Sequence, residues 1–183
     1  CDSVEIIDCD VDNLSEEELK NKIADKSPDI VGTTVLMDQL CASGHAVTRV
    51  AKEVNKEIIT VMGGVYTTVN PKKAIEDVNL DYACVGEGEN VLPEMIEYFN
   101  GSKPNLPTKG IIYKEKKSGK IIFNGRSTFV TDMDSLPTPA WDLIDFQKYS
   151  GEVAREFSPD SPRDLPYVRL YTSRGCPLSC SFC

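Results

Sequence analysis

The chain has a single histidine among its 183 residues, His45, and this scarcity narrows the metal chemistry that it can support. Structural zinc sites generally need four nitrogen or sulfur ligands in paired spacings. One imidazole, far from any pair of cysteines, does not complete such a set. The sequence therefore argues against a histidine-built metal centre.

Long apolar runs and an excess of basic residues are missing as well. The apolar stretches are far shorter than the roughly 20 residues of a membrane-spanning helix, and no secretory signal is visible. Lys and Arg number 20 against 29 Asp and Glu, whereas nonspecific nucleic-acid binding needs a basic face. We expect no membrane span and no nucleic-acid partner. A reducing cytoplasm best fits the seven cysteines, of which Cys9, Cys41 and Cys84 are expected to be small core residues.

Cysteine is concentrated at the carboxyl end of the chain. Cys176, Cys180 and Cys183 stand at C-x3-C-x2-C spacing. Three thiolates can hold three irons of a cubane [4Fe–4S] cluster, which leaves the fourth iron open to a substrate or cofactor. A zinc knuckle and a disulfide pair are the alternatives, but the first lacks a fourth ligand and the second needs an oxidising compartment. The spacing favours the cluster.

Residues 1–101 alternate short apolar runs with helical patterns, which predicts an α/β domain with a parallel sheet. The expected strands are Val4–Asp8, Asp29–Val35, Glu57–Met62 and Asp81–Val85. The expected helices lie at about Ser15–Lys26 and Gln39–Asn55, in a short segment from Pro71, and at Asn90–Asn100. Ser15 with Glu18 forms a capping box, and Gly101 suits a helix stop.

The composition changes after Gly101, and 102–166 is predicted to be a linker. Within it, apolar residues alternate around Lys-Ser-Gly over Gly110–Asn124, which predicts a β-hairpin. A short helix is expected near Trp141–Tyr149. Residues 167–172 have the pattern of a strand, so 167–183 is expected to begin another domain.

Three unusual loops follow the predicted strands, at the carboxyl edge where open parallel sheets bind ligands. Adjacent glycines permit positive φ and leave no Cβ in the way of a ligand, and threonine hydroxyls can bond amides or phosphates. Tight turns alone would also explain each glycine loop, but three on one rim favour a ligand site. Glu87 and Glu89 could suggest acid–base chemistry, but they precede a predicted helix, so a structural role in capping and in helix-dipole electrostatics is expected. The loops are Thr33-Thr34-Val35, Gly63-Gly64-Val65-Tyr66-Thr67 and Gly86-Glu87-Gly88-Glu89.

These patterns together resemble one known family. An aromatic residue, Phe182, precedes the third cysteine as it does in radical S-adenosylmethionine (SAM) enzymes. The series Val-Gly-x-Thr, Gly-Gly-x-Tyr-x-Thr and Gly-Glu-Gly-Glu resembles the cobalamin-binding domain upstream of many radical SAM modules. The resemblance implies a flavodoxin-like (Rossmann-like) parallel sheet, then a hairpin and linker, and then the start of a radical SAM partial TIM barrel.

The resemblance also assigns cofactors to residues. The open iron would bind SAM, with Phe182 in the SAM site, and the three loops would surround cobalamin. Methyl-carrying cobalamin domains supply a cobalt ligand from Asp-x-His-x-x-Gly, but the residues around His45 include neither that Asp nor that Gly. We therefore expect His45 on a helix face and not as an axial ligand. The implied cobalamin residues are Thr33, Thr34, Val35, Gly63, Gly64, Val65, Tyr66, Gly86, Glu87, Gly88 and Glu89.

In a flavodoxin-like sheet the strand order is 2-1-3-4-5, with the first strand central. If Val4–Asp8 is the second strand, the first lies upstream of Cys1, and the chain is expected to be a fragment cut at both ends. As the front part of a cobalamin-dependent radical SAM enzyme, it would act with a small-molecule substrate and a flavodoxin- or ferredoxin-type reductant. Methyl transfer to carbon, ring formation or a related radical reaction is expected.

Two other interpretations stay open. In the first, the chain is a non-catalytic cobalamin carrier or sensor, or another nucleotide-binding Rossmann-like module. In the second, the radical SAM chemistry is retained, and the α/β domain holds no cobalamin and serves as a scaffold.

Overall fold

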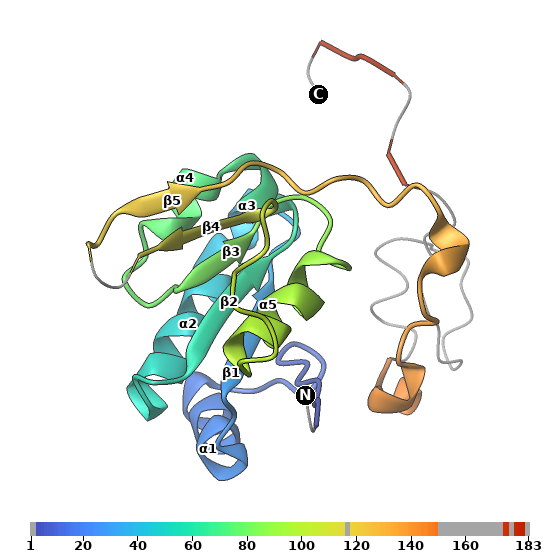
Figure 1. Cartoon of the computed structure of the whole chain (residues 1–183). Helices are drawn as coiled ribbons and strands as arrows, with labels where there is room; N and C mark the ends of the chain where they lie inside the picture. Colours follow the sequence, from blue (N-terminus) through green and yellow to red (C-terminus); the bar gives the residue numbers. More distant parts are fainter. Residues whose placement is uncertain (1–2, 116–117, 150–173, 176–177, 182–183) are drawn as a thin grey trace. The chain divides into compact units, whose positions relative to one another are not determined.

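A computed structural model describes residues 3–115, 118–149, 174–175 and 178–181, and it contains one five-stranded sheet (Figure 1). The strands pair in chain order; the first three are parallel and the last two are antiparallel. This confirms the α/β class with a mainly parallel sheet. The strands are β1 (Ile30–Thr34), β2 (Ile59–Gly63), β3 (Tyr82–Cys84), β4 (Ile111–Lys114) and β5 (Ile121–Phe123).

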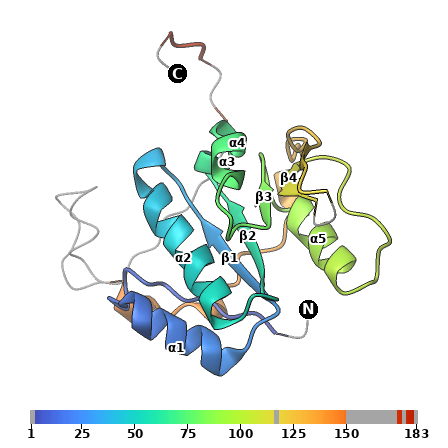
Figure 2. The same cartoon turned by 90° about the vertical axis from the view of Figure 1, so that its left-hand side faces the viewer.

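Helices cover both faces of the sheet, and Figure 2 shows α2 and α5 on opposite sides of it. The connections after β1 and β2 place α2, α3 and α4 on one face, while α5 lies on the other and α1 packs against α2. The elements are α1 (Glu16–Lys26), the 3-10 helix η1 (Asp38–Leu40), α2 (Cys41–Val54), α3 (Val65–Val69), α4 (Pro71–Ile75) and α5 (Val91–Phe99).

The core forms on both faces because successive strand residues point to opposite sides of the sheet. Met62 is buried on one side with Ile75, and its neighbour Val61 packs on the other side with Met95. Each buried side chain of this size contributes roughly 1.5–3 kcal/mol to folding. The two clusters therefore fix β2, which carries the Gly63–Gly64 loop, from both directions.

Local sequence rules are confirmed at the helix ends. The Ser15 hydroxyl accepts from the Glu18 amide, and the Glu18 carboxylate accepts from the Ser15 amide at 2.9 Å. Pro71 begins α4, and Gly101 follows α5 with a φ of +80°. These signals depend on neighbouring residues only, so tertiary packing does not alter them.

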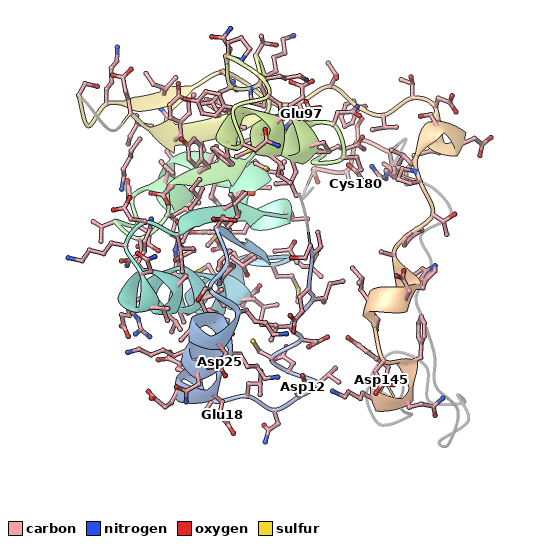
Figure 3. The ribbon with its side chains drawn as sticks, turned by 60° about the horizontal axis from the view of Figure 1, so that its bottom comes forward. Asp12, Glu18, Asp25, Glu97, Asp145 and Cys180 are labelled. Carbon is pink, nitrogen blue, oxygen red and sulfur yellow. The ribbon has the colours of Figure 1, made fainter. Side chains whose placement is uncertain are left out.

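The prediction of a strand at Val4–Asp8 is wrong, because these residues pair with no strand in the described part of the chain. Glu5–Asp12 belongs instead to a second compact unit, together with the described residues from Pro139 onward. There the Asp8 carboxylate accepts from the Tyr149 hydroxyl at 2.7 Å. Asp12 and Asp145, labelled in Figure 3, lie on the two segments of this unit. The apolar alternation of Val4–Asp8 indicated a strand, but a strand needs a neighbour to pair with.

The predicted linker also contains more regular structure than expected. The predicted β-hairpin is present, and β4 pairs with β3, so the hairpin extends the main sheet. The short helix expected near 141–149 is two separate 3-10 helices, η3 (Trp141–Leu143) and η4 (Phe146–Lys148); another, η2 (Met133–Ser135), precedes them.

The predicted strand at 167–172 lies outside the described residues, and the three predicted domain ranges stay predictions. No helix in the described ranges is long and apolar enough to cross a bilayer.

A polar cluster ties the amino ends of β2 and β3 to α2. The Lys52 ammonium donates to Asp81 Oδ2 and to the Ile58 carbonyl, both at 2.6 Å. The same Asp81 oxygen accepts from the amide of Thr60, whose side chain is fully buried. The cluster thus supplies hydrogen bonds to polar groups that the sheet and α2 enclose.

Replacing Asp81 by alanine is expected to lower the free energy of unfolding by about 3 kcal/mol, because Lys52 and the Thr60 amide lose their acceptor inside the fold. Chemical denaturation measures this change. Glu53→Ala is the matched control, since Glu53 pairs with Lys20 and Arg49 only at the surface. Equal stability of the two variants would show that the cluster does not stabilise the sheet.

Candidate functional site

The three predicted loops meet at the carboxyl edge of β1, β2 and β3. The Val35 amide donates to the Gly63 carbonyl at 3.0 Å, and the Tyr66 amide donates to the Val35 carbonyl at 3.1 Å. The third loop is joined through the Gly86 amide, which donates to Thr68 Oγ1 at 2.9 Å. The backbone of all three loops is therefore held in one connected edge.

Packing alone requires two of the loop glycines. Gly64 has a φ of +97°, and a Cβ built there would overlap the Val35 carbonyl oxygen. Gly86 also has a φ of +97°, and its Cβ would lie 2.5 Å from Ser127 Oγ. For these two positions the tight-turn explanation is sufficient.

Packing does not explain the other two loop glycines. A Cβ at Gly63 or at Gly88 would meet no atom within 4 Å, and neither residue has a positive φ that disfavours a side chain. Gly32, which lies on β1, is equally open. These positions leave backbone accessible at the sheet edge, as the close approach of a large ligand requires. The open backbone at Gly63 and Gly88, which we call the cradle, thus leaves room for a ligand.

Apolar side chains surround this edge, and the sequence analysis did not select most of them. Val65 is 54% exposed at the start of α3, and Leu36 and Met37 are 59% and 56% exposed directly after β1. Thr34 is exposed and Thr33 half-buried, while Val35 is in the core. The uninterrupted apolar run Val35–Met37 beyond the strand end is the signal that could have identified this rim.

Glu87 has a structural contact. Its carboxylate accepts from the Val130 amide at 2.5 Å, so it fastens the segment that follows the hairpin to the third loop. The expected structural role thus has a different basis from the predicted capping of the helix: α5 begins at Val91, with Asn90 as its N-cap residue.

Tyr66 points into the fold, away from the edge. Its side chain is 2% exposed, and its hydroxyl lies 3.2 Å from His45 Nε2. His45 Nδ1 lies 2.7 Å from Asp77 Oδ2. Both ring nitrogens of the only histidine therefore have partners within the protein, and His45 lies on α2, as expected.

Most of the cysteine motif lies outside the described residues: Cys176, Cys183 and the neighbouring Phe182 are not described. Cys180 is described and exposed (Figure 3). Among the other cysteines, Cys84 is buried as expected, and burial raises the pKa of its thiol to about 11, which disfavours the thiolate that metals bind. Cys9 and Cys41 are half-buried. In the described part of the chain, no group of three or more His, Cys, Asp or Glu side chains is arranged to hold a metal ion.

The sequence of this chain is similar to those of known proteins. The family model for the B12 binding domain matches residues 2–96. An uncharacterized methyltransferase of Pyrococcus horikoshii is 28% identical over 98% of this chain and 36% of its own length. The anaerobic magnesium-protoporphyrin IX monomethyl ester cyclase of Rubrivivax gelatinosus is 30% identical over 97% of this chain and 30% of its own length.

A solved structure agrees with these relatives. The cobalamin-dependent S-adenosylmethionine radical enzyme OxsB, with aqua-cobalamin and S-adenosylmethionine bound, superposes with a TM-score of 0.61 and 25% identity over 77% of this chain and 19% of its own. The chain thus spans about a third of the length of the curated relatives it matches. Since the family model covers more than half of the chain, the chain belongs to the family of proteins with a B12 binding domain.

Proposed function

We propose that the chain binds cobalamin at the carboxyl edge of β1, β2 and β3 and forms the front part of a cobalamin-dependent radical SAM enzyme. The open backbone at Gly63 and Gly88 carries the proposal, because these two glycines have no steric reason within the protein itself. The exposed rim of Leu36, Met37 and Val65 supports it, since the methyl-rich periphery of a corrin needs apolar contacts.

The residues proposed to contact cobalamin divide by how they act. Gly63 and Gly88 let the cofactor approach the backbone, Thr34 presents an exposed hydroxyl, and Val65 supplies apolar surface. Tyr66 contributes through its backbone only, because its side chain is buried. The remaining predicted residues (Thr33, Val35, Gly64, Gly86, Glu87 and Glu89) shape the loops. His45 leaves the cobalt without a histidine from this chain, since both its nitrogens are engaged.

Cys176, Cys180 and Cys183 are proposed to hold a [4Fe–4S] cluster, with Phe182 beside the SAM site. When bound, the cluster supplies the electron that cleaves SAM. The reaction proposed for the whole enzyme is methyl transfer to carbon or a related radical reaction on a small-molecule substrate, with a flavodoxin- or ferredoxin-type reductant. The names of the relatives, a methyltransferase and a cyclase, support both reaction types.

Titration of the chain with hydroxocobalamin tests the proposal. We expect a change in the visible spectrum on binding, and we expect Gly63→Leu to weaken the affinity at least about tenfold, because the new side chain fills the open cradle. Glu57→Leu is the matched control: it adds the same side chain beyond the opposite end of β2. Gly63→Leu should keep the thermal stability of the unaltered chain, since a Cβ at this position meets nothing.

Two results would contradict the proposal. If hydroxocobalamin does not bind the unaltered chain, the α/β domain is a scaffold without cobalamin. If it binds equally to both leucine variants, the cofactor site is elsewhere.

A further inference from the structure

A line of polar side chains leads from the surface of α2 to the second loop of the cobalamin edge. Asp77 lies in the turn after α4, His45 on α2 and Tyr66 on α3. The contacts are Asp77 Oδ2 to His45 Nδ1 at 2.7 Å and His45 Nε2 to the Tyr66 hydroxyl at 3.2 Å. The rings of His45 and Tyr66 meet edge to face, with centroids 5.8 Å apart. The line thus has specific geometry at both of its contacts.

The hydrogen bonds to Asp77 determine where the proton of the imidazole lies. Asp77 Oδ1 accepts from the Asn79 amide at 2.9 Å, and Oδ2 accepts from Thr48 Oγ1 at 3.0 Å. Burial alone would raise the pKa of Asp77, but the hydrogen bonds from Asn79, His45 and Thr48 together hold it below its ordinary value. The carboxylate is therefore an acceptor, and His45 Nδ1 must donate to it. In the neutral imidazole, Nε2 then accepts from the Tyr66 hydroxyl.

Tyr66 connects the hydrogen bond with His45 to the backbone at the carboxyl edge of the sheet. It follows the Gly63–Gly64 pair closely, and its amide donates to the Val35 carbonyl, which also lies against Gly64. The Val35 amide in turn donates to the Gly63 carbonyl. A displacement of the Tyr66 ring therefore moves the backbone of two of the three loops. The phenol itself is buried and directed toward His45.

We infer that His45 and Asp77 are positioning residues for cobalamin binding, which act through Tyr66 on the Gly63–Val65 turn. The inference rests on the proposed cobalamin site and adds to it a group of side chains that do not contact the cofactor. Orientation by supporting hydrogen bonds is a general requirement of tight sites, because a loop that is held in its bound geometry loses less entropy when the ligand binds.

The single histidine makes the test unambiguous, because the chain has one pair of imidazole nitrogen signals in a proton–nitrogen NMR spectrum. We expect Nδ1 to carry a proton in that spectrum, because it faces the Asp77 carboxylate, which can only accept. Hydroxocobalamin should shift the Nε2 signal of the unaltered chain, because the Tyr66 loop is engaged. Tyr66→Phe should abolish that shift and weaken hydroxocobalamin binding roughly fivefold, the effect of one lost hydrogen bond.

Variants along the line separate positioning from a general loss of structure. His45→Gln should weaken hydroxocobalamin binding to a similar degree, and the double variant with Tyr66→Phe should bind no more weakly than either single variant, since each breaks the same line. Arg49→Ala is the matched control: Arg49 lies one turn further along α2, and its ion pairs within the described residues are with Glu16 and Glu53 at the surface. It should bind hydroxocobalamin as the unaltered chain does. Tyr66→Phe keeps the ring in the core, and Asp77→Asn provides a second variant if His45→Gln does not fold.

The outcomes distinguish this inference from the proposed function. If the unaltered chain binds hydroxocobalamin while the His45 signals do not move and the single variants bind equally well, the positioning role is overturned and the cobalamin site stands. If the unaltered chain does not bind at all, both are overturned. Strictly additive losses in the double variant would also overturn the inference, because they would show two independent effects.

Discussion

Gly64→Ala is expected to destabilise the chain by roughly 3 kcal/mol or more, whereas Gly63→Ala, one residue earlier, leaves the stability nearly unchanged. Gly64 has φ +97° and ψ −171°, a region almost restricted to glycine. A methyl group there would overlap the Val35 carbonyl oxygen and lie 2.9 Å from the carbonyl carbon. The two loop hydrogen bonds that involve Val35 would have to shift.

Thermal unfolding followed by circular dichroism measures this difference. For a chain of this size the Gly64 variant should unfold roughly 10 °C below the unaltered chain. Because domains are stabilised by only about 5–15 kcal/mol in total, a loss of this size also lowers the yield of folded protein. Gly63→Ala is the control in the same turn. Equal unfolding temperatures for the two variants would mean that the loop adopts another backbone conformation.

Replacing the three cysteines of the motif should abolish iron binding. A chain with Cys176, Cys180 and Cys183 all replaced by alanine is expected to retain no iron after anaerobic reconstitution with iron and sulfide. The unaltered chain should take up about four irons and show the broad visible absorption of a cubane. Iron and sulfide analysis, together with the absorption spectrum, measures the outcome.

The matched control replaces the other described cysteines, Cys9, Cys41 and Cys84, by alanine in the same way. This variant should reconstitute like the unaltered chain, since Cys84 is buried with its pKa raised to about 11. Equal iron content in the two triple variants would remove the motif from the proposal. Uptake of zinc in place of iron would favour the zinc-knuckle alternative.

The sequence predicted the elements that depend on local chemistry. The capping box at Ser15, the helix start at Pro71 and the three parallel strands after residue 28 are all present, because they follow from neighbouring residues and from apolar periodicity. Val4–Asp8 has the same periodicity as those strands but is not in the sheet. Periodicity reports which side chains seek burial, and it does not report whether a pairing partner is present.

The site was predicted at the level of loops and not of side chains. Gly63 and Gly64 are the same residue type and adjacent in the sequence. Only their three-dimensional surroundings show that packing requires Gly64 and that a side chain at Gly63 would meet no atom. Tyr66 was grouped with the ligand residues, but its side chain points toward His45, a partner 21 residues away. Such contacts between distant segments leave no mark in a local pattern.

The order of strands in the sheet is the order of strands along the chain. Each of the described strands after β1, as it leaves the ribosome, therefore has a pairing partner already synthesised beside it. None of these strands must wait for a distant segment, which keeps the loops that close during folding short. At a translation rate of roughly 5–20 residues per second, the sheet can be built one strand at a time from β1 onward, before the cysteine motif has been translated.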